Sequence, residues 1–457
     1  MQKPSNPQGT RDFGPEIMRK REYILDTIKT VYKKYGFEPI ETPSLEKLET
    51  LEGKYGEEGD KLLYKIRSNK ELAAEVTSEQ AEGLKKLLPG AWIAGESKLG
   101  LRYDLTVPFA RFVVQHRNDI TFPFRRYQIQ NVWRADRPQK GRFREFTQCD
   151  ADCIGSNSLL HEADLIQIYN EVFVGLGLPN AVLKVNHRKF LEALVDELKI
   201  DFPVGKFTST LDKLDKIGEE GVIKELTAYG IDEGKCKQLF AIIDNAVLTI
   251  ENLSVFAKAF NNNSIAQNAI DDLAKVLTFL GDNKLDIRVE LDLSLARGLD
   301  YYTGCIFEAI VPDSGMGSVS GGGRYDDLTG VFGLKDVSGV GISFGIDRIY
   351  EIIEAAELWP DNLHTNQSIL LCHFDEASLV YAVQLASRLR KDGLQAVVFP
   401  DLKRINKQFD FANKIGVKYA LVVGDTEMSK GNLTVKNLIK GEQQTLSYNE
   451  ALAYLKN

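Results

Sequence analysis

The residues best suited to chemistry lie between positions 142 and 153, where charged, aromatic and amide side chains occur at every second position. Side chains of a β-strand alternate between its two faces. A strand running from Arg142 to Cys153 would therefore carry on one face Arg142, Arg144, Phe146, Gln148, Asp150 and Asp152. Arginine donates paired hydrogen bonds to phosphate or carboxylate, and an aromatic ring stacks on a nucleobase. This order suits a ligand with an anionic end, a planar base and a cationic end, although the alternation alone also fits a solvated strand face.

The chain that must position these residues has 457 residues, of which 43% are hydrophobic and 27% charged. This is an ordinary globular composition, and the length predicts about three domains. No stretch approaches the ~18 apolar residues of a membrane-spanning helix, and the N-terminus lacks a secretory signal. We therefore expect a soluble cytoplasmic protein with no membrane partner.

The charge and the cysteine content argue against a nonspecific nucleic-acid-binding protein and against a protein with a bound metal. The net charge of −8 argues against indiscriminate nucleic-acid binding, although residues 368–457 carry 12 Lys and Arg against 9 Asp and Glu. The five cysteines are scattered and have no histidine cluster beside them, so we expect free thiols in a reducing compartment and no bound metal. They are Cys149, Cys153, Cys236, Cys305 and Cys372.

The hydrophobic periodicity and the glycine and proline residues predict the elements around these side chains. The first is a helix that begins at Pro15 and ends at Gly36, followed by an edge or turn segment containing Pro39 and Pro43. The later elements are an antiparallel pair over 122–154, a helix over 158–175, mainly helices over 188–284, strands over 287–311, a strand-to-helix junction at Gly345, and alternating strands and helices after 368 with a largely parallel sheet.

Three short segments resemble the motifs of class II aminoacyl-tRNA synthetases. The pattern from Arg134 through Arg142 and Phe146 to Asp150 resembles motif 2. Pro43 resembles the proline of motif 1, which implies a homodimer, and Gly345–Arg348 resembles motif 3. Three motifs in the family's order are specific where one alone would be weak.

Four further segments are similar to histidyl-tRNA synthetases, namely Gly9–Phe13, Leu101–Pro108, Leu295–Tyr302 and Gly321–Asp326. The resemblance runs nearly the full chain and implies an α+β catalytic domain on an antiparallel sheet, with a helical insert and a C-terminal α/β anticodon-binding domain. The expected domains are residues 1–187 and 285–360 for the two parts of the catalytic domain, 188–284 for the insert and 368–457 for the anticodon-binding domain.

The resemblance also implies the reaction and the residues at its centre. Histidine is activated with ATP to histidyl-adenylate and then transferred to tRNA(His). Arg134 would bind the α-phosphate, Arg142 and Arg348 the outer phosphates, and Phe146 the adenine. Arg297 would bridge the histidine carboxylate and the α-phosphate, so Arg297 and Arg134 are the implied catalytic residues. Mg²⁺ is expected with ATP, but the sequence does not identify its ligands.

The implied histidine-binding residues are Asp104, Thr106, Gln148, Asp152, Arg297, Tyr301 and Tyr302. Asp104, Thr106 and Gln148 would contact the α-ammonium group. The imidazole has two ring nitrogens that each need a partner, and Asp152 and Tyr302 occupy the matching positions. Some family members have Glu at positions 104 and 152, so the contacts made by the shorter Asp stay open.

Other interpretations remain for the glycines and for the whole chain. The run Gly321–Gly323 would let the backbone approach a ligand closely, or would form a flexible turn. A catalytically inactive regulatory subunit of histidine biosynthesis, a class II synthetase for another amino acid and a generic nucleotide-binding protein are the alternatives. The presence of Arg297 and of the 368–457 segment argues against the regulatory subunit.

Overall fold

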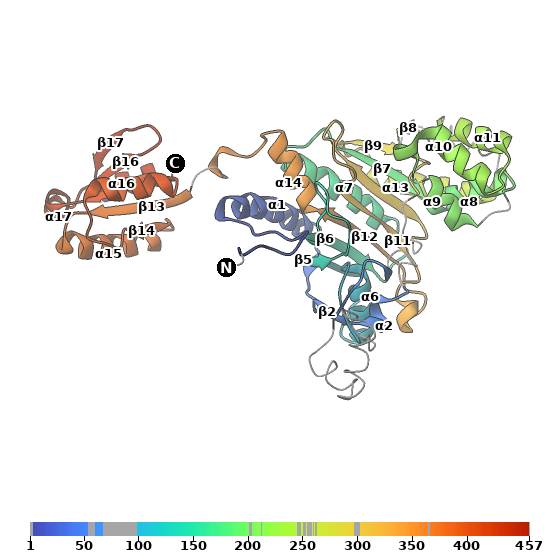
Figure 1. The fold of residues 1–457 in the computed structure, drawn as a ribbon, viewed down its shortest axis with the longest axis horizontal. Helices are drawn as coiled ribbons and strands as arrows, with labels where there is room; N and C mark the ends of the chain where they lie inside the picture. Colours follow the sequence, from blue (N-terminus) through green and yellow to red (C-terminus); the bar gives the residue numbers. More distant parts are fainter. Residues whose placement is uncertain are drawn as a thin grey trace. The chain divides into compact units, whose positions relative to one another are not determined.

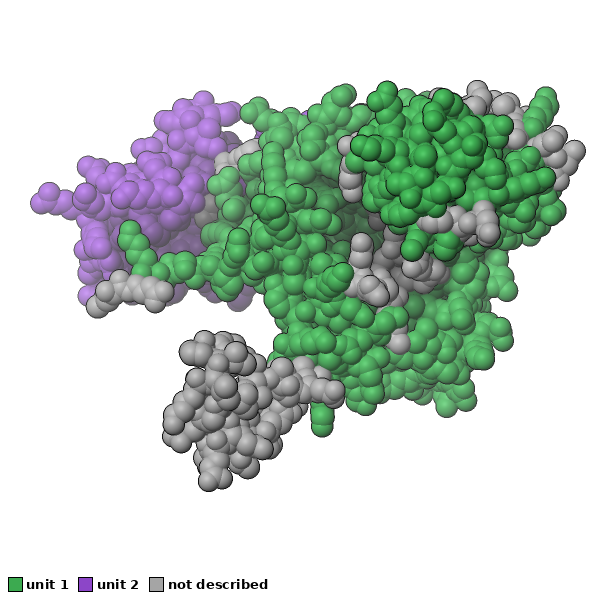
Figure 2. Space-filling model, turned by 45° about the vertical axis from the view of Figure 1, so that its right-hand side comes forward, with its two compact units in different colours: residues 1–357 green, residues 358–457 purple. Residues whose placement is uncertain are grey.

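The structure is a computed structural model that describes residues 3–53, 60–66, 98–200, 203–211, 213–244, 248–249, 253, 258, 260, 263–296, 302–363 and 366–456. The chain divides into two compact units, Met1–Glu357 and Leu358–Asn457 (Figure 2). The predicted limits of the insert and of the two catalytic segments stay predictions. Within the described residues, no helix combines the length and the apolar composition needed to cross a bilayer.

A nine-stranded sheet forms the body of the first unit, in the order β1-β5-β6-β12-β11-β10-β7-β9-β8 (Figure 1). Neighbouring strands are antiparallel except in two pairs, β1 with β5 and β7 with β9. The predicted antiparallel catalytic sheet is confirmed. The strands are β1 (Glu38–Pro39), β5 (Phe124–Trp133), β6 (Glu145–Ile154), β7 (Val182–His187), β8 (Leu248–Thr249), β9 (Arg288–Leu291), β10 (Cys305–Ile310), β11 (Ser320–Tyr325) and β12 (Gly339–Gly345).

Three helices pack on one face of this sheet: α1 (Pro15–Lys34), α7 (Leu160–Gly175) and α14 (Ile346–Ala355). The aromatic rings of Tyr169 on α7 and Phe344 on β12 meet edge to face, with centroids 5.2 Å apart. Cys149 and Ala151 on β6 point to the same side and are fully buried. Because strand side chains alternate, the intervening residues of β6 face the opposite side of the sheet, where the candidate site lies.

The remaining elements of the first unit flank the sheet. A small sheet of β2 (Leu45–Lys47), β4 (Leu99–Leu101) and β3 (Tyr64–Ile66) adjoins α2 (Leu48–Leu51) and α6 (Thr106–Gln115). The segment predicted to be mainly helical contains α8 (Arg188–Glu197), α9 (Val204–Leu211), α10 (Leu214–Ala228), α11 (Glu233–Asp244) and α13 (Ser264–Leu280), together with the short strand β8.

The edge of the large sheet agrees with the prediction from its prolines. Strand β1 contains Pro39 and pairs only with β5 among the strands of that sheet. Pro43 and Leu45 follow it and are exposed, Leu45 by 46%. A proline cannot donate a backbone hydrogen bond, so it is tolerated where a strand has one neighbour.

One local prediction was wrong, and one alternative interpretation is excluded. The strand predicted from Arg142 begins instead at Glu145, because Arg142 forms an isolated bridge with Gln139 and the amide of Arg144 bonds the carbonyl of Gly9. The glycine run Gly321–Gly323 is not a turn. It lies inside β11, and a Cβ atom on Gly322 would sit only 2.1 Å from the carbonyl oxygen of Gly341 on β12.

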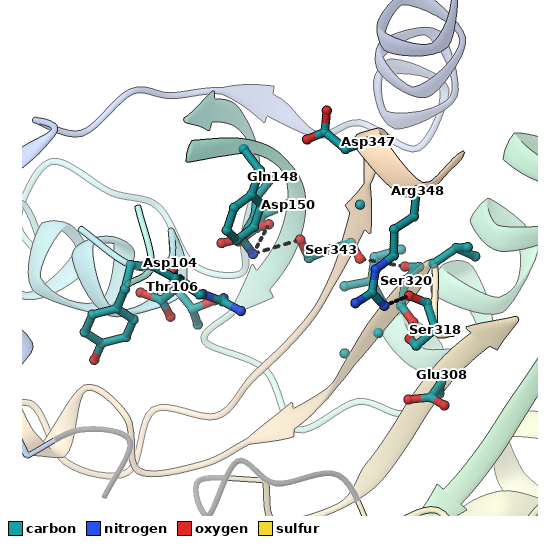
Figure 3. A pocket seen from close by; sticks show the side chains of 18 of the residues that line it. Asp104, Thr106, Gln148, Asp150, Glu308, Ser318, Ser320, Ser343, Asp347 and Arg348 are labelled. Carbon is teal, nitrogen blue, oxygen red and sulfur yellow. Dashed lines mark hydrogen bonds between the residues drawn. The ribbon is translucent and has the colours of Figure 1, made fainter. Parts of the chain in front are cut away.

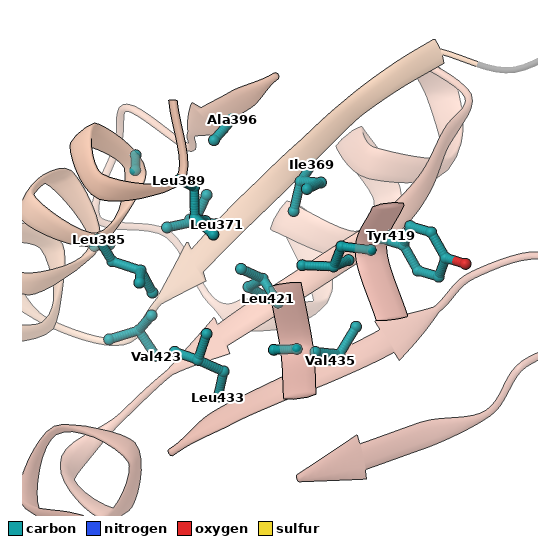
Figure 4. Packing of buried hydrophobic residues seen from close by; sticks show 14 residues of the cluster. Ile369, Leu371, Leu385, Leu389, Ala396, Tyr419, Leu421, Val423, Leu433 and Val435 are labelled. Atoms are coloured by element: carbon teal, nitrogen blue, oxygen red, sulfur yellow. The ribbon is translucent and has the colours of Figure 1, made fainter. Parts of the chain in front are cut away.

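The second unit has a five-stranded sheet in the order β14-β13-β15-β16-β17, with its own cores. Figure 4 shows one of them, where Leu371 and Leu421 of the sheet meet Leu385 and Leu389 of a helix. The sheet is mixed, because β14, β13 and β15 are parallel but β16 and β17 are antiparallel, so the largely parallel prediction was only partly right.

The elements of the second unit are β13 (Asn366–His373), α15 (Glu376–Lys391), β14 (Ala396–Val398), α16 (Ile405–Lys414), β15 (Val417–Val423), α17 (Asp425–Lys430), β16 (Leu433–Asn437), β17 (Gln443–Leu446) and α18 (Tyr448–Lys456).

Candidate active site

A cavity of about 480 Å³ opens on the side of the sheet opposite α1 and α7. Its size falls in the range of small-molecule sites. Nine of the eleven residues predicted for the site line this one cavity: Asp104, Thr106, Arg134, Arg142, Phe146, Gln148, Asp152, Tyr302 and Arg348. The other two, Arg297 and Tyr301, lie outside the described residues.

The three predicted arginines line the cavity from three different segments of the chain. Arg134 follows β5, and its Nε donates to the carbonyl of Tyr103 at 2.9 Å. Its guanidinium lies 5.2 Å from the ring centroid of Phe146 on β6. Arg348 begins α14 and donates through Nε to the carbonyl of Gly141 at 3.3 Å, and through Nη1 to the carbonyl of Ser318.

Arg142 belongs to the loop between β5 and β6 and is the most exposed of the three. Its side chain is 48% exposed and lies 3.5 Å from a carboxylate oxygen of Asp136. Arg144, which the sequence placed on the same face, does not line the cavity. Its Nε donates to the carbonyl of Asp136, and its side chain packs on Gly9, because the strand begins after it.

A carboxylate-rich region forms another part of the cavity lining. Gln148, Asp150 and Asp152 alternate along β6 as predicted, and Asp104 faces them from the segment before α6 (Figure 3). Gln148 Nε2 donates to Ser343 Oγ at 3.0 Å on the neighbouring strand β12. Asp104 Oδ1 accepts from the amide of Val107 at 3.3 Å. Gln148 Oε1 is buried and accepts no hydrogen bond within the described part of the chain.

Burial governs the ionisation of these carboxylates. It raises the pKa of Asp150 to about 7, and the positive charge of Arg126 offsets part of that rise. Burial likewise raises the pKa of Asp152, against the opposing effects of Arg126 and of the hydrogen bond from Tyr325. Buried carboxylates of this kind favour a cationic or hydrogen-donating ligand, since such a ligand replaces the lost water.

The glycines of β11 and β12 make room for the site. A Cβ on Gly341 would lie 2.0 Å from Asp152 Oδ1, and a Cβ on Gly323 would lie 2.7 Å from the ring of Tyr302. Larger residues at either position would displace a predicted contact to the imidazole. Close approach of the backbone of Gly321–Gly323 to a ligand stays a prediction; the structure shows that the missing side chain of Gly323 leaves room for the ring of Tyr302.

Sequence reasoning did not assign Asp150, Glu308 or Asp347 to the site, yet all three line the cavity. Asp150 was on the predicted face and was left unassigned. Glu308 is an acid in the otherwise apolar strand β10, and an acid in such a strand is a sequence signal that could have pointed to the site. Asp347 already forms two ion pairs, because Arg11 and Arg21 both lie against its Oδ1, at 2.6 and 2.5 Å.

Arg324, which belongs to the Gly321–Asp326 segment, makes structural contacts and does not line the cavity. It points away from the cavity to α7, where its Nη2 donates to Glu162 at 2.6 Å and both side chains are buried. Its Nη1 also donates to Ser338 at 2.6 Å. The pair anchors β11 to the helical layer and thereby holds Tyr325 on the cavity side.

All five cysteines are buried free thiols. Burial raises the pKa of Cys153 to about 11 and that of Cys372 to about 12, so these thiols stay protonated. Among the described residues, no group of three or more His, Cys, Asp and Glu side chains is arranged to hold a metal ion.

A cavity lined by arginines and by buried carboxylates, on a largely antiparallel sheet, is the arrangement expected of a class II aminoacyl-tRNA synthetase. Comparison with known families specifies it further. The histidyl-tRNA synthetase family matches residues 9–87 and 92–349, and an anticodon-binding domain family matches residues 364–457. The chain belongs to the histidyl-tRNA synthetase family.

Individual relatives agree over the full length. The histidine–tRNA ligase of Cytophaga hutchinsonii is 47% identical over 454 residues, covering 99% of both chains. That of Bacteroides fragilis is 45% identical, again over 99% of both. Among solved structures, histidyl-tRNA synthetase from Nostoc sp. has a TM-score of 0.83 at 28% identity, and covers 99% of this chain and 98% of its own.

Proposed function

We propose that this chain is a histidine–tRNA ligase, which activates L-histidine with ATP and transfers the histidyl group to tRNA(His). The observation that carries the proposal is the combination of charged groups in one cavity, where Arg134, Arg142 and Arg348 line the same space as Asp104 and Asp152. Arginines suit phosphates and a carboxylate, and buried carboxylates suit an ammonium group and an imidazole N–H group, so the cavity suits ATP together with an amino acid. Full-length similarity to histidine–tRNA ligases supports the same activity, and does not favour the regulatory-subunit alternative.

In the first step, a carboxylate oxygen of histidine attacks the α-phosphorus of ATP in line, and diphosphate leaves. Negative charge on the non-bridging oxygens is stabilised by Arg134 and, at the outer phosphates, by Arg142 and Arg348. Arg297 is proposed to bridge the two reacting anions. Fixed cations of this kind act mainly through positioning and charge stabilisation.

In the second step, a terminal ribose hydroxyl of tRNA(His) attacks the histidyl carbonyl and AMP leaves.

The remaining cavity residues are proposed to bind the substrates. Phe146 is proposed to stack on the adenine, and its ring centroid lies 5.2 Å from the guanidinium of Arg134. Gln148, Thr106 and Asp104 are proposed to hold the α-ammonium group. Tyr302 and Asp152 are proposed to meet the two imidazole nitrogens.

Magnesium ions are proposed to enter with ATP. Mg²⁺ prefers oxygen ligands, usually one or two carboxylates together with the phosphates. Glu308 lines the cavity near Ser318 and Arg348, at the end proposed for the phosphates (Figure 3). Asp347 fits less well, because two arginines already approach it. Glu308 is therefore the residue that would hold the metal that neutralises phosphate charge.

The partners and the setting follow from the same proposal. The unit containing residues 368–457 is proposed to bind the tRNA anticodon, and residues 188–284 to form a separate insert between the catalytic segments 1–187 and 285–360. The exposed edge at Pro43 and Leu45 is proposed to contribute to a homodimer. The free, buried cysteines fit a reducing compartment, and we propose a cytoplasmic location.

The test is aminoacylation of a tRNA(His) transcript with radiolabelled histidine, using the purified full-length chain and ATP. Histidyl-tRNA should accumulate, and an Arg134→Ala variant should lose activity while keeping the wild-type melting temperature. A folded wild-type protein that binds histidine but forms no histidyl-tRNA would contradict the proposal and favour the regulatory subunit.

A further inference from the structure

A buried arginine, Arg126, pairs with the lining residue Asp152 but does not itself line the cavity. Arg126 is on β5, where it stands opposite Asp152 of β6 in the antiparallel register. Its side chain is fully buried, and its Nη2 lies 2.8 Å from Asp152 Oδ2. A buried charge is costly unless it is paired, so this cation needs a specific reason to be there.

The contacts of Arg126 reach both halves of the proposed histidine site. Besides Asp152, its Nη2 donates to the carbonyl of Leu105 at 3.4 Å, and Leu105 lies between Asp104 and Thr106. The guanidinium also lies 4.1 Å from the ring centroid of Phe109 on α6. One side chain therefore connects the segment proposed to hold the α-ammonium group with the carboxylate proposed to hold the imidazole.

Asp152 is fixed from three directions. Tyr325 donates its hydroxyl to Oδ1 at 2.7 Å, Arg126 approaches Oδ2, and the backbone of Gly341 closes the third side. Within the described residues, Oδ2 accepts no hydrogen bond, although it lies beside the cation. A fixed carboxylate oxygen with remaining acceptor capacity is what an imidazole N–H group requires.

We propose that Arg126 is a positioning residue that holds Asp152 as a fixed acceptor for the imidazole N–H and ties it to the α-ammonium segment through Leu105. The inference rests on the proposed function and adds a residue that never touches the substrate. Among the described residues, its hydrogen bonds and ion pairs are to Leu105 and Asp152 and none is to Arg134, Arg142 or Arg348, so its action should be confined to histidine.

The experiment measures histidine-dependent ATP–diphosphate exchange by Arg126→Met, with Arg125→Met as the matched control. Arg125 is the neighbouring residue on the same strand and forms an ion pair of the same length, 2.8 Å, with Asp164. We expect the Arg126 variant to raise KM for histidine roughly 30-fold or more, with KM for ATP changed less than about threefold. The control should leave both constants within about threefold of wild type.

A double-mutant cycle with Asp152→Asn tests whether Arg126 acts through Asp152. The double variant should be no worse than the worse single variant, because both changes remove the same fixed acceptor. Independent, additive effects on KM for histidine would overturn the inference. So would equal rises in KM for histidine and for ATP, or an equal effect of Arg125→Met.

If Arg126→Met does not fold, Arg126→Lys replaces it, with Arg125→Lys as its control. Lysine keeps the charge but lacks the planar fork that reaches both partners. KM for histidine should rise without a change in KM for ATP, and an unchanged KM for histidine would overturn the inference. A wild-type protein without histidine-dependent exchange would overturn the proposed function itself, whereas active wild type with unaffected variants would overturn only the role of Arg126.

Discussion

Gly341 gives a quantitative test of how tightly the imidazole end of the cavity is built. A Cβ atom at this position would lie 2.0 Å from Asp152 Oδ1 and 2.4 Å from its Cγ. Such contacts are essentially never shorter than 3.0 Å, so the carboxylate must move by about 1 Å in a Gly341→Ala variant. A displacement of 1 Å at a reacting site costs roughly 100-fold in rate, equivalent to about 2.7 kcal/mol.

The assay is histidine-dependent ATP–diphosphate exchange, with KM measured separately for histidine and for ATP. We expect KM for histidine to rise roughly 100-fold and KM for ATP to change less than about threefold, because the atoms nearest to the added Cβ belong to Asp152 and Ala151 and not to Arg134, Arg142 or Arg348. Overpacking should also lower the free energy of unfolding by about 1–3 kcal/mol. Gly14→Ala is the control, since a Cβ there meets no atom within 4 Å. A folded Gly341→Ala protein with the wild-type KM for histidine would refute this reasoning.

Three further predictions concern charge and the second unit. Because the pKa of Asp150 is raised to about 7 by burial, the folded state holds a proton there that the unfolded state releases near pH 4, so stability falls as pH rises between these values. Asp150→Asn should therefore be more stable than wild type in urea titrations at pH 8, with the difference shrinking toward pH 4; an equal difference at both pH values would contradict this. Arg324→Met leaves Glu162 buried and unpaired, and should lower the free energy of unfolding by about 3–5 kcal/mol in the same titrations, whereas a loss below about 1 kcal/mol would show that the pair is not an anchor. Removal of residues 358–457 should lower tRNA charging at least about tenfold more than histidine-dependent exchange, equivalent to 1.4 kcal/mol of tRNA binding, and equal losses would indicate a structural role for that unit.

Much of the cavity was predictable from the period of a strand. Phe146, Gln148, Asp150 and Asp152 line it because β6 alternates strictly from Glu145 onward. The prediction failed at Arg144, where no local pattern shows that the chain is still in a loop. That loop is set by a backbone hydrogen bond to Gly9, a residue 135 positions away in sequence.

Residues that act through long-range pairing were the hardest to predict. Arg126 faces Asp152 only because two strands adopt a particular register, which the sequence of either strand does not specify. The glycine run was ambiguous for the same reason, since the close approach of β12 to Gly322 is a tertiary contact. Arg324 lies in a recognisable motif, yet its partner Glu162 comes from a helix far away in the chain.

The second unit shows the same limit at the level of topology. Alternating strands and helices from Ser368 to Val423 correctly predicted β13, α15, β14, α16 and β15, whose parallel pairing needs helical crossovers. Strands β16 and β17 are short and follow one another through a turn, so their antiparallel pairing completes the sheet without a crossover.

The measurement that tests the central claim most directly is ATP–diphosphate exchange by the full-length protein with each of the twenty amino acids. A site with fixed polar partners for both imidazole edges should support exchange with histidine, and should discriminate against amino acids lacking those edges by ~10⁴-fold or more. Comparable exchange with a different amino acid, from protein whose folding has been verified, would contradict the assignment of Asp152 and Tyr302 as the imidazole partners.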